Sequence, residues 1–594
     1  MFHTQKLVRY GLTAILLSTT PIAAWAQTDP LALLVKDLVK RGELSPADAQ
    51  EIIAVSKSEH GAQPAQPAPA APPPVPAAPQ SAGTIVSTAT TPDGTMHLTY
   101  VPKYVRDQIA DQVQQQVVAQ EHAQGNAAPF EVPDWVNRLH FYGDVRARYQ
   151  MDNFPHGNDD SGDLVNYNAI NTGSPLDVSQ AGLATTKPPS LNVNEDRAVF
   201  ELRARLGVDA DLGDGFTAGF RIATGSSDSP VSENQVLGAA PSGTQGGDFS
   251  KYAIWLDRAY IAYQPDIDED VKVKLEVGRF ENPFFATNLI WADDLNFDGV
   301  AVQGSYDFEN GVVPFLTLGA FPVYNTDFNF GSTNSVKFPS HDKWLYAVQA
   351  GTDYKIDDNF ALKFGAAYYY FTNMEGQLSS PCTVLSASTA CDTDDDRPQF
   401  AQNGNTYMLL RNIVSTAANS EGTTTQYQYF GLASPFQELA LTGRFDVTGL
   451  APVDSWIIAE YVRNLAFNKN SVASRAFNNF GGVAADAPSG TVAPYEGGNQ
   501  GFFITVSVGD KDLEKRWDWN AFLGYKYLES DAVVDGLTDS DFGLGGTNLK
   551  GYIAGGNVAL SSKVWVRLRY LSADEIVGPP YKSDVFQFDL NAKF

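Results

Sequence analysis

The second part of the chain alternates between apolar and polar side chains over many stretches. In the last of them, DVFQFDLNAKF, Phe586, Phe588 and Leu590 fall on one parity, whereas Asp589 and Lys593 fall on the other. A period of two residues is typical of a β-strand with one apolar face and one polar face. Sixteen runs of this kind lie near residues 138–150, 196–208, 215–224, 253–264, 271–279, 299–307, 312–321, 344–355, 359–371, 437–447, 454–465, 501–509, 517–529, 549–560, 563–573 and 584–594.

The connections between these runs alternate between short and long. The short ones include DLGDG, PDIDED, DFENG and IDDN, whose Asp, Asn and Gly residues favour tight turns. Short turns on one side and long loops on the other are typical of a transmembrane β-barrel. A sheet in lipid must close on itself, because hydrocarbon leaves unpaired backbone groups unsatisfied. We therefore expect an all-β transmembrane barrel of sixteen antiparallel strands over residues 135–594.

The first residues have the pattern of a secretory signal peptide. Lys6 and Arg9 precede the apolar run 11–17, and Ala24-Trp25-Ala26 offers a cleavage site with small residues. We expect residues 1–26 to be removed.

The segments that follow the signal predict an N-terminal α-helical extension. Residues 27–60 have the pattern of a helical hairpin, and residues 61–100 form a Pro/Ala-rich linker with a short extended segment. Residues 101–124 predict an amphipathic helix, which is either a self-associating coiled coil or a lone linker helix. Its apolar stripe consists of Val101, Val105, Ile109, Val113 and Val117.

Composition narrows the class of protein. The formal net charge of −28 argues against nucleic acid as a partner. After the signal no apolar run reaches the length of a membrane-spanning helix, which excludes a helical membrane protein. Cys382 and Cys391 are the only cysteines, and in an oxidising compartment they predict a disulfide that closes one loop.

Catalytic and metal-binding signals are weak. No two histidines have the spacing of zinc ligands, and no serine lies in a nucleophile elbow. We expect no enzyme activity, no metal site and no cofactor.

A basic group is the clearest candidate for function. Seven arginines share the parity of the lumen-facing side chains: Arg146, Arg148, Arg203, Arg205, Arg221, Arg567 and Arg569. They either line the pore or form a structural salt-bridge ladder with neighbours such as Asp144 and Glu201. The two interpretations are compatible.

Three segments resemble a known family: HFYGDVRARYQ, FELRARLGVDADLGDGFTAGFRIATGSSDSPVSENQ and GRFENPFFATNLIWADDLNFDGVAV. They are similar to the "putative porin" family of Gram-negative outer membranes, over most of residues 135–594. The resemblance implies a pore in the outer membrane, in contact with lipid and lipopolysaccharide, with the N-terminal region in the periplasm. A last strand that ends in Phe594 resembles the signal recognised by the barrel-assembly machinery.

The same resemblance gives a role to the third long loop, which in sixteen-stranded porins folds inward and narrows the pore. Here that loop contains Asn282-Pro283, which favours a fixed turn. We expect Phe284, Phe285, Leu289 and Trp291 to pack against the inner wall, and Asp293 and Asp294 to face the lumen and the arginines. A loop that caps a contact between trimer subunits is the alternative.

These patterns predict a porin for passive diffusion of small polar solutes and ions, assembled as a homotrimer. The eyelet is expected to favour anions. The alternative function is a cell-envelope tethering protein, whose periplasmic helices bind peptidoglycan while the barrel serves as an anchor.

Overall fold

The computed structural model describes residues 88–90, 96–98, 134–239, 247–326, 339–449, 453–478, 480 and 494–594. The predicted signal peptide 1–26, helical hairpin 27–60 and amphipathic helix 101–124 lie outside the described residues. In the linker the structure describes two short antiparallel strands, β1 (Thr88–Thr90) and β2 (Met96–Leu98).

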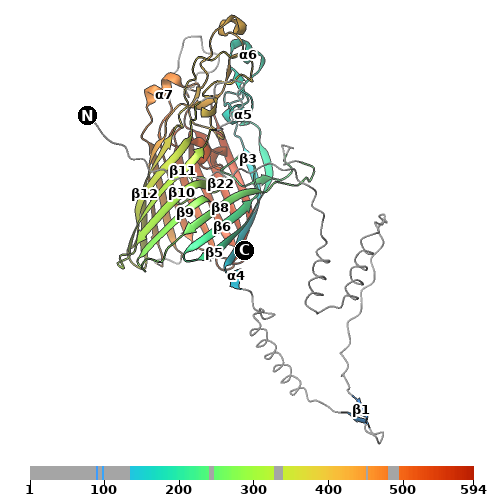
Figure 1. The fold of residues 1–594 in the computed structure, drawn as a ribbon, viewed down its shortest axis with the longest axis vertical. Helices are drawn as coiled ribbons and strands as arrows, with labels where there is room; N and C mark the ends of the chain where they lie inside the picture. The colour runs from blue at the N-terminus through green and yellow to red at the C-terminus, as the bar shows by residue number, and fades with distance from the viewer. Residues whose placement is uncertain are drawn as a thin grey trace, which may run out of the picture. The chain divides into compact units, whose positions relative to one another are not determined.

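Sixteen long strands among the described residues close into an antiparallel barrel, as predicted (Figure 1). Every alternating run of the sequence coincides with one of them. They are β3 (Leu139–Asn153), β5 (Arg197–Gly213), β6 (Phe216–Ala223), β8 (Trp255–Tyr263), β9 (Val271–Glu281), β10 (Asn296–Tyr306), β11 (Val312–Tyr324), β12 (Lys343–Lys355), β13 (Phe360–Thr372), β17 (Gln437–Val447), β18 (Ser455–Asn464), β19 (Gln500–Gly509), β20 (Trp519–Leu528), β21 (Leu549–Ala559), β22 (Val564–Glu575) and β23 (Lys582–Lys593). A two-residue strand, β7 (Gln235–Val236), adds to the edge of β5.

The last strand closes the barrel against the first. In the pairing of β23 with β3, Asp589 lies opposite Arg148 and Asn591 lies opposite Arg146. The backbone amide of Phe594 donates to the carbonyl of Gly143 at 3.1 Å, and the reverse bond measures 3.2 Å. A Cβ atom at position 143 would come within 2.5 Å of the backbone oxygen of Arg205 on β5 and 2.6 Å of Cζ of Phe594, so the close approach of the neighbouring backbone requires glycine there.

The two faces of the strands differ as the alternation predicts. On β23, Phe588 and Leu590 are 42% and 43% exposed, whereas Gln587 and Asp589 are 0% and 1% exposed. The apolar side chains therefore point away from the barrel and the polar ones point into it. An apolar exterior is what a barrel in lipid requires.

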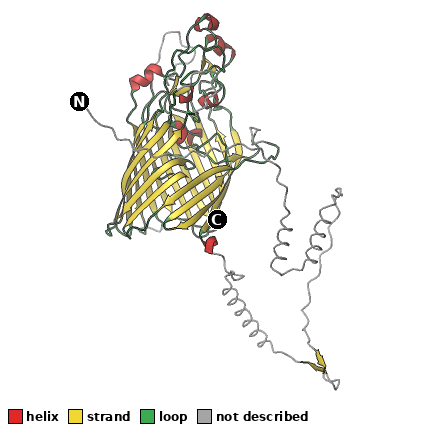
Figure 2. Ribbon diagram, in the orientation of Figure 1, coloured by secondary structure: helices red, strands yellow, loops and turns green. Residues whose placement is uncertain are grey.

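Short turns and long loops are sorted to opposite ends of the barrel (Figure 2). Turns such as 307–311 and 356–359 are tight, and the long loops fold together at the other end. In loop 373–436, β14 (Tyr407–Leu409) pairs with β16 (Phe430–Leu432), while β15 (Tyr427–Gln428) pairs with β4 (Leu176–Asp177) from loop 154–196. The last long connection is an exception: β22 and β23 extend until only residues 576–581 separate them.

The helices of the described residues are short. They are α4 (Asp134–Asn137), α5 (Tyr167–Thr172), α6 (Gln180–Thr185) and α7 (Lys469–Arg475), with 3-10 turns η1 (Asp394–Asp396), η2 (Ala417–Gly422), η3 (Asp535–Leu537) and η4 (Phe542–Leu544). None of the helices that the structure describes has both the length and the apolar character needed to cross a bilayer.

Candidate pore constriction

The connection between β9 and β10, residues 282–295, lies against the inner face of the barrel. It begins with a turn in which the amide of Phe284 donates to Oδ1 of Asn282 at 2.9 Å. The carbonyl of Pro283 accepts a bond from Nε2 of Gln303 on β10 at 2.8 Å. The side chain of Gln349 on β12 then bonds both the amide and the carbonyl of Phe285, each at 2.8 Å.

An aromatic cluster holds this loop to the wall. The ring of Phe284 packs edge-on against Tyr369 of β13, with centroids 5.3 Å apart. The indole of Trp291 contacts Tyr369 and Phe297, with centroids 5.1 Å from each. Such edge-to-face pairs add stabilisation beyond the burial of their area.

The loop also reaches the far side of the lumen. Thr287 bonds Glu460 of β18 through Oγ1 at 2.5 Å, and Nζ of Lys526 on β20 donates to the carbonyl of Asn288 at 3.3 Å. The loop therefore spans the interior from β9 and β10 to β18 and β20.

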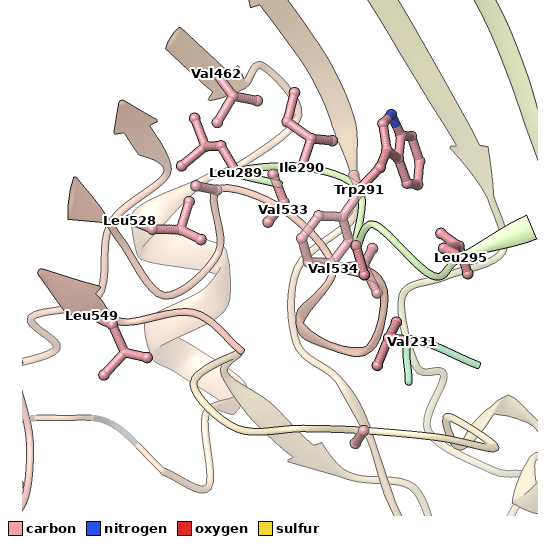
Figure 3. Close-up of a cluster of buried hydrophobic side chains, with 14 of the residues drawn as sticks. Val231, Leu289, Ile290, Trp291, Leu295, Val462, Leu528, Val533, Val534 and Leu549 are labelled. Atoms are coloured by element: carbon pink, nitrogen blue, oxygen red, sulfur yellow. The ribbon is translucent and has the colours of Figure 1, made fainter. Parts of the chain in front are cut away.

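A second inward loop, residues 529–548, supports the first. Oγ1 of Thr538 donates to the carbonyl of Leu289 at 2.8 Å, and the amide of Ala292 donates to the carbonyl of Leu537 at 2.9 Å. Figure 3 shows Val533 and Val534 of the second loop beside Leu289, Ile290 and Trp291 of the first, in one buried apolar cluster. No prediction from the sequence gives a role to this second loop.

Asp294 joins loop 282–295 to two arginines of β5, Arg203 and Arg205. Its Oδ1 lies 2.9 Å from Arg203 and 3.6 Å from Arg205. Both arginines also contact Asp144 of β3, at 3.0 and 2.6 Å.

Two further loop carboxylates complete the network. Glu233, in the connection between β6 and β8, lies 3.2 Å from Arg205 and 3.3 Å from Arg221. Asp541, in loop 529–548, lies 3.2 Å from Arg148 and also bonds Arg569.

Carboxylates on the strands pair with the same arginines. Arg148 donates to both oxygens of Asp589, at 2.7 and 3.1 Å. Arg221 bonds Asp257 of β8. Glu201 lies 4.0 Å from Arg148, at the limit of an ion pair.

Among the described residues, Arg146 and Arg567 have no carboxylate partner. Arg146 donates to the amide oxygen of Asn234. The guanidinium of Arg567 lies 5.8 Å from the ring centroid of Phe522. Asp293 likewise has no hydrogen-bond or ion-pair partner in the part of the chain that the structure describes.

The unpaired groups meet in one cavity of about 200 Å³ between the loops and the wall. Its charged lining is balanced rather than dominated by arginine: Arg146, Arg203, Arg567, Arg569, Asp293, Asp294, Asp539 and Asp541. The predicted balance of seven arginines against two loop acids lacks five carboxylates that the structure places beside them: Glu233, Asp257, Asp539, Asp541 and Asp589. Strand parity could have supplied Asp257 and Asp589; no local pattern marks the other three.

Two of the loop carboxyls are shifted in opposite directions. Burial alone would raise the pKa of Asp541, but the guanidiniums of Arg148 and Arg569 hold it well below its ordinary value. Burial raises the pKa of Glu233 to about 8; the carboxylate of Asp294 adds to the increase, and Arg205 opposes it. The arginines therefore keep Asp541 charged, whereas burial makes Glu233 easier to protonate than an ordinary glutamate.

The two cysteines lie in loop 373–436, where Cys382 and Cys391 form a disulfide. Beside it, the amide of Cys391 donates to Oδ2 of Asp394 at 3.1 Å. The guanidinium of Arg411 donates hydrogen bonds to both oxygens of the same carboxylate, at 2.7 and 2.6 Å. The disulfide thus belongs to an ordered loop structure outside the arginine network.

A closed antiparallel barrel with an apolar exterior, a charged interior and inward-folded loops defines a transmembrane β-barrel channel. The family described as "Putative porin" matches residues 30–594, so the chain belongs to that family. The protein is thus a channel protein of the Gram-negative outer membrane, in agreement with the resemblance seen in the sequence.

Several solved structures are similar to the chain. The outer membrane channel DcaP of Acinetobacter baumannii shares 11% identity, with 77% of this chain and 97% of that chain covered and a TM-score of 0.35. OprB of Pseudomonas putida shares 11% identity, with 78% and 96% covered and a TM-score of 0.39. OmpT of Vibrio cholerae, in its trimer form, shares 10% identity, with 77% and 99% covered and a TM-score of 0.34. These identities are too low to carry a residue's role from one chain to another.

No curated protein matches the sequence significantly.

Proposed function

We propose that the barrel is a porin, a water-filled channel for the passive diffusion of small polar solutes and ions. The observation that carries the proposal is the position of loop 282–295. The loop runs from β10 across the lumen to β18, and its Asp294 forms an ion pair of 2.9 Å with Arg203 of β5. A loop held in this way narrows the lumen and brings its carboxylates close to the arginines of the wall.

The charges provide the selectivity of this constriction. Carboxylates and guanidiniums on facing surfaces create a transverse field, which favours polar and charged solutes over apolar ones. Five of the seven arginines are engaged by carboxylates and hold the loops in place. Among the described residues that line the cavity, Arg146 and Arg567 have no ion-pair partner, and Asp293 is the one carboxylate without one. Two unpaired cations thus face one unpaired carboxylate, so we expect the constriction to prefer anions. Both interpretations of the arginines therefore contribute.

Conductance tests the proposal directly. Purified full-length protein added to a planar lipid bilayer should give stepwise increases in an ohmic current, and a salt gradient should give a reversal potential of the sign expected for anions. The heat-denatured protein is the control. Bilayers that stay silent across several salts would rule out the porin function.

Assembly as a homotrimer, with the N-terminal region in the periplasm, is part of the same proposal. Its support is the apolar stripe of residues 101–117, which suits association of three helices. Native mass spectrometry in detergent should give three protomers. A variant without residues 27–130 should give fewer if the stripe drives assembly, and a full-length monomer would contradict the trimer.

The family assignment favours the channel over the tethering function. A pull-down on isolated peptidoglycan, with the variant that lacks residues 27–130 as control, shows whether the N-terminal region also binds the cell wall.

A further inference from the structure

Three adjacent strands present a small grid of polar side chains to the lumen. Across β22, β23 and β3, one row consists of Arg567, Asp589 and Arg148. Asp589 thus stands between two arginines, but both of its oxygens bind Arg148, at 2.7 and 3.1 Å. Arg567 is left without a carboxylate among the described residues.

In the neighbouring row, too, hydrogen-bond donors lack acceptors among the described residues. It consists of Trp565, Asn591 and Arg146. Asn591 and Arg146 are 6% and 9% exposed. Nδ2 of Asn591 and Nε of Arg146 are buried without a hydrogen-bond partner, and so is Nε of Arg567. Buried donors without acceptors are rare in native proteins, and an unoccupied ligand position is one physical reason for them.

The donors and one free carboxylate share a cavity. Arg146, Arg567 and Asn591 line the space of about 200 Å³ from the wall, and Asp293 lines it from loop 282–295. No ion pair connects Asp293 to Arg567 in the part of the chain described, so a gap separates the two charges. The volume is below the range of about 300–1,000 Å³ typical of sites for drug-sized ligands, which limits the occupant to a small solute.

We propose that this cavity is a binding site for small zwitterionic solutes that carry a carboxylate and an ammonium group. The carboxylate accepts bonds from Arg567, Arg146 and Asn591, and the ammonium group lies toward Asp293. The proposal rests on the porin function, because a solute must reach the cavity through the lumen.

Charge explains why a zwitterion fits better than a simple ion. A plain carboxylate satisfies the wall but meets the negative charge of Asp293, whereas a plain ammonium ion meets the arginines. A zwitterion is attracted both by the arginines of the wall and by Asp293. A simple carboxylate is repelled by Asp293, and a simple ammonium ion is repelled by the arginines. Charge-assisted bonds from guanidinium to carboxylate are among the strongest hydrogen bonds in proteins.

A matched set of solutes tests the site. 4-Aminobutyrate, butyrate and butylammonium share a linear four-carbon chain and differ in their charged ends. Single-channel current through the full-length protein is recorded in KCl, and the concentration of each solute that halves the current is measured. For the wild type we expect 4-aminobutyrate to act at about tenfold lower concentration than either other solute.

Substitutions separate the two halves of the site. Asp293→Asn should remove the advantage of 4-aminobutyrate over butyrate. Arg567→Gln should weaken both solutes about tenfold, and Arg567→Lys should restore part of the block. The exposed residues Asp160 and Arg516 supply the controls, because Asp160→Asn and Arg516→Gln should change neither value.

The outcomes distinguish this site from the porin function itself. A wild-type channel that conducts but is blocked equally by 4-aminobutyrate and butyrate overturns the zwitterion site and leaves the porin intact. An advantage that survives Asp293→Asn overturns it as well. Each variant must conduct to be counted, so a folded channel is verified in the same recording, and a silent wild type would refute the porin function instead.

Discussion

The interior of the barrel has two walls of opposite chemistry. The apolar wall, formed by β10 to β13, presents Phe297, Phe321, Leu345, Tyr369 and Phe371, all nearly or fully buried. The charged wall, formed by β22, β23, β3, β5 and β6, presents the seven arginines and their carboxylates. Both walls use the same alternation of inward and outward side chains, and they differ only in which residues point inward.

Loop 282–295 matches this division along its own sequence. Its aromatic residues Phe284 and Trp291 pack on the apolar wall, and Asp294, which follows them, pairs with Arg203 of the charged wall. Burial and the hydrogen bonds from Gln303 and Gln349 therefore fix the position of the loop on the apolar wall, and an ion pair fixes Asp294 against Arg203. Substitutions can alter each wall separately, so the contribution of each wall to the position of the loop and to ion selectivity can be measured.

The largest effect is expected from the charged wall. Replacing Arg203, Arg205 and Arg221 together by Ser leaves the carboxylates of Asp144 and Glu233, among others, without their partners. The reversal potential in a KCl gradient should move toward cations, and the conductance should increase because bulky side chains are lost. Arg516→Ser, at an exposed turn, is the control. An unchanged reversal potential would mean that these arginines act only as structural supports.

The apolar wall should respond next. Trp291→Ala removes contacts to Tyr369 and Phe297 and should cost about 3–5 kcal/mol, as for other buried aromatic residues. The loop should detach in part, which gives a larger and less uniform single-channel conductance and a lower unfolding temperature. Trp517→Ala, at a side chain that is 62% exposed, should change neither. A variant with normal conductance would show that Trp291 does not hold the constriction.

A smaller effect follows from the titration of Glu233. Its pKa is raised to about 8 by burial and by Asp294, against the opposing effect of Arg205. Below that pH the carboxyl is neutral, so Arg205 and Arg221 lose a counter-charge, although Asp257 still bonds Arg221. Anion preference should therefore rise as the pH falls through 8. Reversal potentials across this range measure it, and Glu233→Gln should flatten the response.

The smallest effect on the channel is expected from the disulfide in loop 373–436. Replacing Cys382 and Cys391 by Ser removes a crosslink over a sequence separation of 9 residues. Closing a loop of this size contributes roughly 2–4 kcal/mol, largely through the unfolded state. The loop should become easier to cleave by protease, while conductance and selectivity stay unchanged. A change in selectivity would place this loop in the conducting path.

Local pattern was sufficient to predict the strands. Lipid outside and polar surroundings inside impose a period of two on every strand, and this period can be read within a few residues. The predicted bounds differ from the observed ones at the strand ends, because backbone pairing with the neighbouring strand determines where a strand begins and ends. β10 begins at Asn296 rather than near 299, because Asn296 still pairs with Glu281 of β9.

The chain by itself thus determined the barrel, the number of strands, the sorting of turns and loops, and the residues that point inward. Only the tertiary structure decided which charges neutralise each other. Arg148 and Asp589 are 441 residues apart and meet because β23 closes on β3. Asp541 and Glu233 arrive on loops that contact loop 282–295, the first through Thr538 and the second through Asp294. Ion pairing depends on distance in space, which no local pattern in the sequence records. The lack of an ion-pair partner for Arg146, Arg567 and Asp293 among the described residues is therefore visible only in the folded barrel.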